Sequence, residues 1–450
     1  MTKAKNLAIV CWLVLGTMSP AFSQEKTVLT LDECLRLALS QNPLYLASRE
    51  KIDGAESQIR QAVANFFPTL SGQGLSNLDK KVFAVTIPSF IPGQPPQRVK
   101  LDFTKTYQFT MAFALPLYAG GRLISGLNTA QHNLDSTLES VRQSRNETVF
   151  SVKQAFYGCL LAKKFAEVAE EGVTLAEKHF QNVRNLYDVG MASKFDLLRS
   201  EVQLANLKPQ LIRARNSVET AELGLKTLLG LDLAQPVEVK GELSFQPHEA
   251  DENELMTKAL AMRPEVRQMD YQRSMAGEML KMAKAAYLPT VAVAGNYNYW
   301  ADNFNFRKQT WESYYSFNLV VNVPIFNGFI NSAKVAESKA ALKGLDYSRR
   351  GLLDMVKLEV KQAVLNLNQA KESLLSQEKN VEQAQESVRI AELNYAEGLA
   401  TNLDVSTTQV ALSQAKTNYS QALFDYVLSL AQLDKAVGSD GGGIESDTSR

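Results

Sequence analysis

The residues that could carry chemistry are few in this chain, and their spacing does not group them. His132, His179 and His248 stand singly, without the spacing of zinc ligands. Cys34 and Cys159 could pair in an oxidising compartment, but nothing in the sequence shows that they meet, and free thiols are the favoured alternative. The chain lacks a nucleophile elbow, a phosphate-binding loop and a metal cluster. We therefore expect no enzyme, no cofactor and no bound metal.

The first residues have the features of a secretory signal peptide, predicted at residues 1–23. Two lysines precede an apolar run from Leu7 to Met18, and Ala21 and Ser23 occupy the −3 and −1 positions of a cleavage site. The run is too short to cross a bilayer. Removing the two lysines from 48 basic and 48 acidic residues leaves a net charge of −2. This balance does not suggest nucleic acid as a partner.

The remaining chain contains two copies of one unit. Pro68 corresponds to Pro289 at a separation of 221 residues, and Pro116 corresponds to Pro324 at a separation of 208. The offset changes once, by 13 residues, so the first copy has one insertion, and four prolines in it indicate an enlarged loop. The predicted organisation is a first repeat at 24–230, a connector at 231–251, a second repeat at 252–438 and a disordered tail at 439–450.

Two segments of each repeat alternate between apolar and polar residues, which is the pattern of β-strands. The predicted strands lie at about 69–79, 103–116, 290–300 and 313–324. Each is roughly ten residues long, the length that crosses a bilayer when tilted. Amphipathic hairpins in a soluble sheet would also alternate, but the amide-rich opposite face favours membrane strands. Aromatic residues around one loop predict a girdle at a membrane interface: Tyr297, Tyr299, Trp300, Trp311, Tyr314 and Tyr315.

Four strands cannot close a barrel, and an open edge in lipid leaves backbone groups without hydrogen-bond partners. Several chains must therefore share one barrel. Two chains would give eight strands, whose lumen side chains largely fill. Three chains would give twelve strands and leave room for a passage.

A long helical hairpin follows the second strand of each repeat, at 121–230 and 328–438. The stretch from Gly121 to Asp188 contains no proline, and as one helix it would be roughly 100 Å long. In both copies an eleven-residue hydrophobic period gives way to a seven-residue period. The first period suits nearly straight helices in a cylinder wall, and the second suits a left-handed coiled coil. We therefore predict a mainly α-helical protein with a transmembrane β portion.

The duplicated order of helix, strand pair, long helix, glycine-containing tip and return helix resembles the TolC-like outer-membrane efflux protein family, from about Leu31 to Gly438. The resemblance implies a homotrimer with a twelve-stranded β-barrel in outer-membrane lipid and a periplasmic α-helical barrel. The implied partners are a periplasmic adaptor (membrane fusion) protein and an inner-membrane pump of RND, ABC or MFS type. The implied function is an outer-membrane exit duct of a tripartite efflux or type I secretion system, conducting cargo passively.

The resemblance also implies a gate at the periplasmic end. Asp404 occupies the first acidic gate position of the family, and Tyr395 and Asp196 match positions that link neighbouring coils. The second acidic position holds Thr407 and the expected basic link position holds Ala400, so the resemblance implies one acidic ring rather than a full latch. An aspartate at a helix start also stabilises the helix N-terminus, so both roles stay open for Asp404.

The hairpin ends predict tips that dock the adaptor. Gly190 and Ser193 in the first repeat correspond to Gly398 and Thr401 in the second. Turn chemistry alone would also select a glycine after one helix and a hydroxyl residue before the next. The alternative function is a soluble periplasmic coiled-coil scaffold, which needs neither alternating strands nor an aromatic girdle. The sequence does not specify the cargo.

Overall fold

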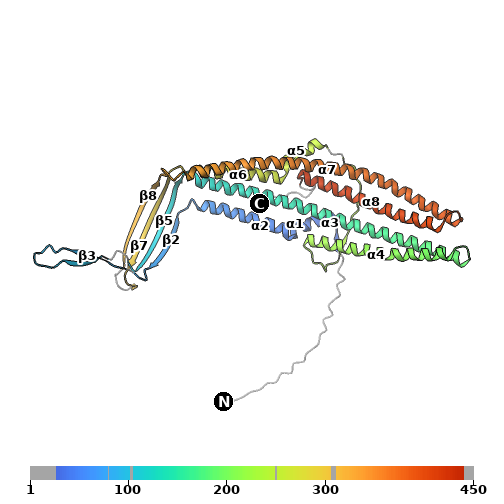
Figure 1. Cartoon of the computed structure of the whole chain (residues 1–450), viewed down its shortest axis with the longest axis horizontal. Coiled ribbons are helices and arrows are strands. Elements are labelled where there is room, and N and C mark those ends of the chain that lie inside the picture. The colour runs from blue at the N-terminus through green and yellow to red at the C-terminus, as the bar shows by residue number, and fades with distance from the viewer. Residues whose placement is uncertain (1–26, 80, 102–104, 249–250, 306–310, 440–450) are drawn as a thin grey trace, which may run out of the picture.

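The computed structural model describes residues 27–79, 81–101, 105–248, 251–305 and 311–439. The predicted signal peptide and all but the first residue of the predicted tail lie outside the described residues. The chain is elongated, with a sheet towards one end and long helices running away from it (Figure 1).

The elements follow the duplicated order of the sequence. The first part of the chain contains β1 (Thr27–Leu29), α1 (Leu31–Gln41), α2 (Pro43–Ala64), β2 (Thr69–Ser76), β3 (Phe83–Ile87), β4 (Gln97–Leu101), β5 (Tyr107–Ala119), α3 (Arg122–Asp188) and α4 (Lys194–Leu229). The second part contains β6 (Val237–Val239), α5 (Glu252–Met262), α6 (Pro264–Ala285), β7 (Thr290–Ala301), β8 (Glu312–Asn322), α7 (Ile330–Ala396) and α8 (Asn402–Val437). Corresponding helices have equal lengths of 11, 22, 67 and 36 residues, as duplication requires.

The main sheet is antiparallel with the strand order β2-β5-β7-β8. Residues paired directly across two strands point to the same face, and successive residues alternate between faces. Phe109 pairs with Tyr299 on the apolar face. Thr110 pairs with Asn298 on the other face, where the Thr110 hydroxyl donates to Asn298 Oδ1 at 2.8 Å. The sheet therefore has one apolar face and one polar face.

Two short sheets lie outside the predicted strands. The proline-rich insertion, expected as a loop, contains the antiparallel pair β3 and β4. The connector contains β6, which pairs in parallel with β1. Leu29 and Val239 are paired and almost fully buried. The connector therefore folds because it covers a hydrophobic core formed by α1, α3 and α4.

The long helices α3 and α7 begin at backbone positions in the left-handed region. Their N-cap residues are Gly121, with a φ of 87°, and Phe329, with a φ of 68°. Glycine adopts this conformation without steric cost, whereas a bulky residue there is strained. Proline occupies the first turn of α2 and α6, where its missing N–H removes no helical hydrogen bond. Among the described residues, no helix combines the length and apolar character needed to cross a membrane.

Each repeat has its own core near the middle of the rod. The first core includes Cys34 and Cys159, which are free thiols and fully buried. Burial raises the pKa of each thiol to about 12. The second core includes Val356, Val360 and Leu367, which belong to the eleven-residue period of α7.

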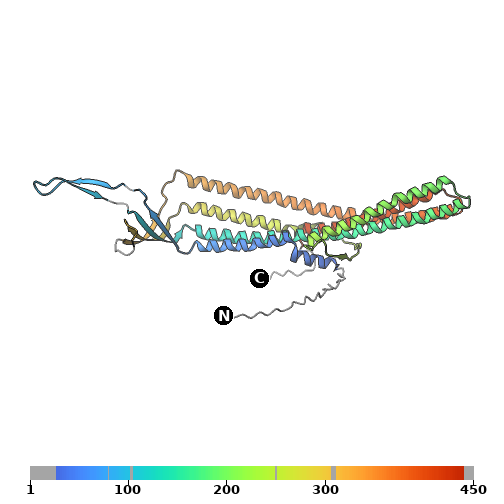
Figure 2. The same ribbon diagram turned by 90° about the horizontal axis from the view of Figure 1, so that it is seen from below.

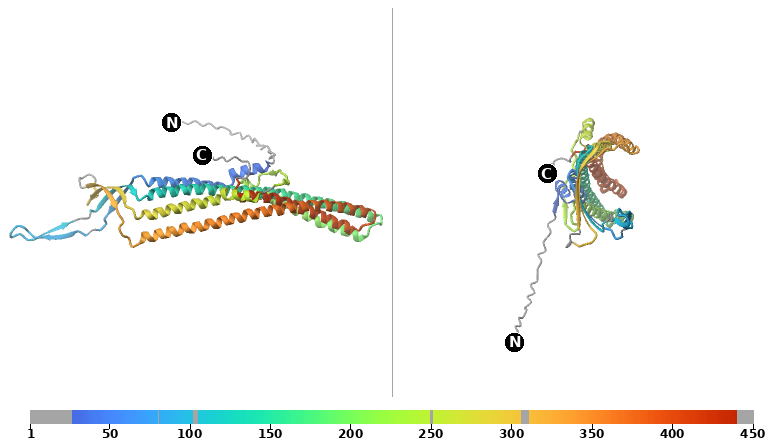
Figure 3. Two further views of the ribbon diagram at one scale, coloured as in Figure 1. Left: turned by 90° about the horizontal axis from the view of Figure 1, so that it is seen from above. Right: turned by 90° about the vertical axis from the view of Figure 1, so that its left-hand side faces the viewer.

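Across the width of the chain, the helices are arranged in the same spatial order as the strands. Towards the sheet, α3 packs between α2 and α6, and α6 packs against α7. Towards the tips, α3 packs between α4 and α8, and α8 packs against α7. The two orders place α7 at one edge throughout, with α2 at the other edge near the sheet (Figure 2) and α4 at the other edge near the tips (Figure 1). Seen end-on, the chain forms an open arc (Figure 3).

Candidate functional site

The two hairpins end in matching tips far from the sheet (Figure 1). Gly190 and Gly398 have φ values of 80° and 77°, which L-amino acids with side chains rarely adopt. Ser193 and Thr401 are the N-caps of the return helices α4 and α8. All four residues are exposed. The predicted docking residues therefore form a pair of open tips whose shape depends on glycine.

Asp404 lies in the first turn of α8 and is exposed. Its carboxylate accepts hydrogen bonds from the hydroxyl of Thr401 at 2.6 Å and from the backbone N–H of Thr401 at 2.8 Å. These hydrogen bonds from Thr401 lower the pKa of Asp404 below its ordinary value. The local capping role considered for this residue is therefore present, and the carboxylate remains available to solvent.

Asp196, at the first turn of α4, meets the second hairpin through its backbone. Its carbonyl oxygen accepts a hydrogen bond of 2.9 Å from Nδ2 of Asn402, at the start of α8. Its carboxylate accepts a hydrogen bond of 2.6 Å from the hydroxyl of Ser193. Burial, followed by the charge of Asp196, raises the pKa of Tyr395. The structure thus brings Asp196 and Tyr395 into electrostatic range, whereas Asp404 interacts with its own cap residue.

A buried histidine joins this cluster from the outgoing helix α3. Nε2 of His179 lies 2.6 Å from Oδ1 of Asn402, and both residues are over nine-tenths buried. Because the Asn402 amide N–H donates to Asp196, its oxygen faces His179, so Nε2 of His179 carries the proton. The ring of His179 also contacts the ring of Tyr395 edge-on, with centroids 5.5 Å apart. Four helices therefore meet at one buried polar link.

Sequence reasoning missed His179 and Asn402, although the repeat contains a signal for both. At the constant offset of 208 residues, His179 corresponds to Ser387 and Asn402 corresponds to Lys194. The corresponding residues, Ser387 and Lys194, cannot form the same histidine–asparagine hydrogen bond. Positions near the tips at which the copies differ were therefore the ones to inspect for contacts between the hairpins.

Further polar contacts join the hairpins between the tips and the middle of the rod. The hydroxyl of Ser406 on α8 donates to Oε1 of Gln203 on α4. Lys416 on α8 forms an ion pair with Glu171 on α3. The second hairpin is thus attached to the first by hydrogen bonds and charge along much of α8.

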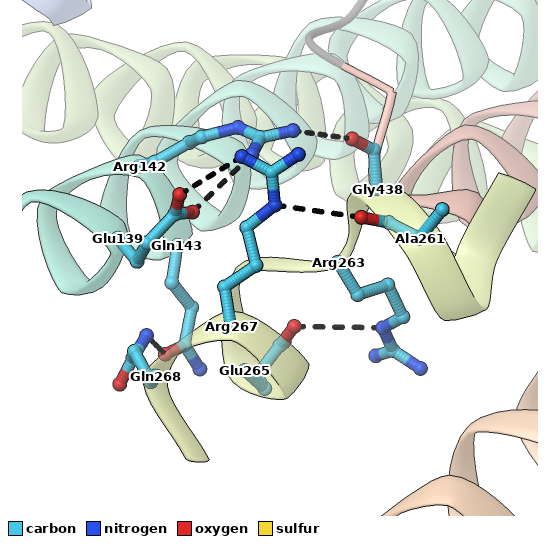
Figure 4. Close-up of polar contacts among 9 residues, drawn as sticks. All are labelled: Glu139, Arg142, Gln143, Ala261, Arg263, Glu265, Arg267, Gln268 and Gly438. Atoms are coloured by element: carbon cyan, nitrogen blue, oxygen red, sulfur yellow. Dashed lines mark hydrogen bonds and ion pairs between the residues drawn. The ribbon is translucent and has the colours of Figure 1, made fainter. Parts of the chain in front are cut away.

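A separate polar cluster ties the repeats together at mid-length (Figure 4). Glu139 on α3 forms ion pairs with Arg142 at 3.2 Å and with Arg267 on α6 at 3.3 Å. Arg142 donates to the carbonyl of Gly438 at the end of α8, and Arg267 donates to the carbonyl of Ala261. The side chains of Glu139 and Arg142 are 12% and 21% exposed, so this pair is little screened by solvent, whereas the Arg267 side chain is 49% exposed. The middle of the rod is therefore one connected body.

The six aromatic residues predicted as a girdle divide between the two faces of the sheet. Tyr297 pairs with Tyr315 on the apolar face, and Trp311 stacks on Tyr299 with ring centroids 4.8 Å apart. Trp300 and Tyr314 lie on the polar face, because successive residues of a strand point to opposite faces and their neighbours Tyr299 and Tyr315 lie on the apolar face. These two rings lie 5.1 Å apart, and the indole N–H of Trp300 donates to Glu312 at 3.0 Å. The expectation of one girdle must be revised for Trp300 and Tyr314.

Exposed aromatic residues also gather where the strands join the helices, which sequence reasoning did not identify. Phe326 and Phe329 contact each other edge-on after β8, and both are at least 73% exposed. Phe67 and Tyr287 are exposed on the approaches to β2 and β7. Aromatic side chains therefore mark both ends of the sheet.

Comparison with known proteins agrees with this architecture. The family model described as "Outer membrane efflux protein" matches residues 34–231 and 255–439. The outer membrane protein TolC of Vibrio cholerae is 21% identical over 440 residues, which cover 97% of this chain and 95% of that protein. The alkaline protease secretion protein AprF of Pseudomonas aeruginosa is 25% identical over 305 residues, covering 66% of this chain and 62% of AprF. The solved structure of VceC from Vibrio cholerae has a TM-score of 0.71 at 16% identity, covering 91% of this chain and 96% of VceC.

The chain belongs to the outer membrane efflux protein family. Its fold is that of the TolC-like channels, as the sequence predicted. The protein is an outer-membrane exit duct with a large periplasmic helical portion, and a soluble coiled-coil scaffold is not favoured.

Proposed function

We propose that three copies of this chain close one continuous duct from the periplasm to the exterior. The observation that carries the proposal is the common order of strands and helices across the chain. β2 and β8 form opposite edges of the sheet, and each leaves one side unpaired within the chain. In lipid these edges need partners, which the β8 and β2 strands of neighbouring copies would supply. Three chains with four strands each give twelve strands, enough to enclose a passage.

The helical edges support the same head-to-tail closure. On α4 the side chains of Phe195, Leu198 and Val202 are exposed at helical spacing near the tip. On the tip half of α7, at the opposite edge, Ile390 and Leu393 are exposed. Packing α4 of one copy against α7 of the next would bury both sets. Such a heterologous contact forms a ring when its rotation closes.

The duct would receive cargo at the helical tips and release it outside. A periplasmic adaptor would dock at Gly190, Ser193, Gly398 and Thr401 and connect the duct to an inner-membrane pump of RND, ABC or MFS type. The matching open tips support this assignment, as does membership of the family. TtgC of Pseudomonas putida, at 23% identity, is described as a probable efflux pump outer membrane protein, and AprF as a secretion protein. Both small molecules and polypeptides are therefore candidate cargo.

The closed duct would narrow at the tips, where Asp404, Asp196 and Tyr395 lie near the start of the return helices. Three copies of Asp404 would form an acidic ring there and favour cations. The exposure of this carboxylate supports the assignment, and the hydrogen bonds from Thr401 favour its charged form by lowering its pKa. The His179–Asn402 link would hold the two hairpins together in the closed state.

Light scattering of the detergent-extracted protein, corrected for bound detergent, tests the closure. We expect the mass of three mature chains. A stable monomer, or a protein found only in the soluble periplasmic fraction, would overturn the proposal. Planar bilayer recordings of the same preparation should show a small, cation-selective conductance. A closed-state conductance that favours anions would refute the acidic ring.

A further inference from the structure

The ribbon formed by β3 and β4 has one apolar face and one basic face. Directly paired residues share a face, and successive residues alternate. The apolar face carries Phe83, Val85, Ile87, Val99 and Leu101, with Gln97 opposite Ile87 at the turn end. The opposite face carries Ala84, Thr86, Arg98 and Lys100. This amphipathic pattern is that of a strand pair covered on one side only.

Within the described part of this chain, little covers the apolar face. The two strands pack chiefly against each other, and Phe83 is 66% exposed. Phe90, in the turn between the strands, is 95% exposed. An isolated two-stranded hairpin is marginally stable in water. The ribbon therefore needs another surface against its apolar face.

Lipid is poorly placed to supply that surface. The ribbon projects beyond the outer end of the sheet (Figure 2). That end already carries the aromatic stack of Tyr299 and Trp311 and an ion pair of 3.3 Å between Lys105 and Asp302. Aromatic belts lie at the membrane–water interface, so segments further out are in water. The end-on view places the ribbon on the concave side of the arc, towards the duct axis (Figure 3).

We propose that the apolar faces of three β3–β4 ribbons meet over the outer mouth of the duct and cap it. The inference rests on the threefold closure proposed above. The ribbon connects β2 with β5, and β2 is the edge strand that would meet the next copy. Each ribbon therefore begins beside a junction between chains and is continuous with that interface. With the apolar faces together, Arg98 and Lys100 face outwards, so the like charges of the three copies stay apart.

Cysteine cross-linking of the full-length protein in outer membranes tests the cap. Val99→Cys places a thiol on the apolar face, and Lys100→Cys places one on the opposite face of the same strand. After mild oxidation we expect a covalent dimer for Val99→Cys and none for Lys100→Cys. The unmodified protein is the background control, since Cys34 and Cys159 are buried. Absence of the Val99→Cys dimer, or equal dimer formation by both variants, overturns the cap.

A conductance measurement provides a second, independent test. Val85→Asp would place a charge among the apolar faces and separate the ribbons, whereas Thr86→Asp alters the solvent face. In a duct whose tips are opened by Asn402→Ala, we expect Val85→Asp to raise the conductance and the uptake of bulky antibiotics, with Thr86→Asp unchanged. If Val85→Asp behaves like Thr86→Asp, the cap is wrong. Light scattering distinguishes a failure of the cap from a failure of the threefold closure. Three-chain particles without the Val99→Cys dimer refute the cap alone, whereas monomers refute the closure as well.

Discussion

Nε2 of His179 lies 2.6 Å from Oδ1 of Asn402, although the two residues belong to different repeats. His179 lies near the end of the outgoing helix of the first hairpin, and Asn402 begins the return helix of the second. Asn402 also donates to the backbone of Asp196, so one amide group holds two helices of the neighbouring hairpin. Any opening that separates the hairpins must break this buried link.

Asn402→Ala should weaken the closed state of the duct. The substitution leaves the N–H of His179 buried without its acceptor, at a cost of about 1–3 kcal/mol. If that cost falls on the closed state, the open population rises by roughly 5–150-fold. Single-channel recording in planar bilayers should show more frequent or larger openings. Lys194→Ala is the matched control, because Lys194 is the corresponding residue of the first repeat and is exposed. Equal behaviour of the two variants would contradict the link.

Thr401→Val should change the pH dependence of ion selectivity. Hydrogen bonds from Thr401 lower the pKa of Asp404 by favouring its charged form. Without the hydroxyl, the pKa of Asp404 rises towards its ordinary value and the carboxyl is protonated at a higher pH. Cation selectivity should therefore disappear at a higher pH on acidification than in the unmodified protein. Reversal potentials across a salt gradient measure this, and Asp404→Ala should lack selectivity at every pH. Unchanged selectivity in Asp404→Ala would exclude the acidic ring.

Replacing both tip glycines should abolish export while leaving the trimer intact. Gly190 and Gly398 hold positive φ angles at exposed positions, so Leu at both sites would distort the tips without disturbing a buried core. We expect light scattering to be unchanged and efflux, measured as antibiotic resistance in the native host, to be lost. Met191→Leu alters the same tip at an exposed side chain and should preserve export. Export that survives the double glycine replacement would rule out docking at these residues.

The two cysteines should be free and unreactive in the folded protein. Burial raises the pKa of both Cys34 and Cys159 to about 12. At pH 8 the thiolate fraction, and with it the labelling rate, should be lower than in the unfolded chain by on the order of a thousand-fold. Maleimide labelling before and after denaturation, followed by mass spectrometry, measures this. Two labels after denaturation without reductant would confirm free thiols, and a mass two units lower with no label would indicate a disulfide.

The sequence was most informative where a pattern repeats. The duplication was revealed by a shared separation of 221 residues, found between Pro43 and Pro264 and again between Pro68 and Pro289. Alternation placed the four long strands, because a half-buried strand must alternate. The long helices were also predicted from a pattern, because the segments that form α3 and α7 each continue for 67 residues without proline.

Features that depend on one copy alone were harder to predict. The ribbon of β3 and β4 lies in the proline-rich insertion, which was predicted to be a loop because prolines indicate one. By contrast, Trp300 and Tyr299 are neighbours in β7 and must point to opposite faces, so the division of the predicted girdle follows from alternation alone. The contact between His179 and Asn402 joins residues 223 positions apart and follows no period. Such contacts are determined by packing in three dimensions, which one sequence does not display.

The assignment of the two faces of the sheet can be tested with neighbouring residues on β8. Leu319 pairs with Val293 on the apolar face, and Asn318 pairs with Ala294 on the polar face. Leu319→Lys would place a charge in lipid, which costs about 2–4 kcal/mol near the bilayer midplane. We therefore expect Leu319→Lys to lower the stability of the folded barrel in urea titrations. Asn318→Lys would instead face the passage, so it should preserve stability and reduce cation selectivity. If Asn318→Lys is the destabilised variant, the polar face contacts lipid and the duct interior has been assigned to the wrong side of the sheet.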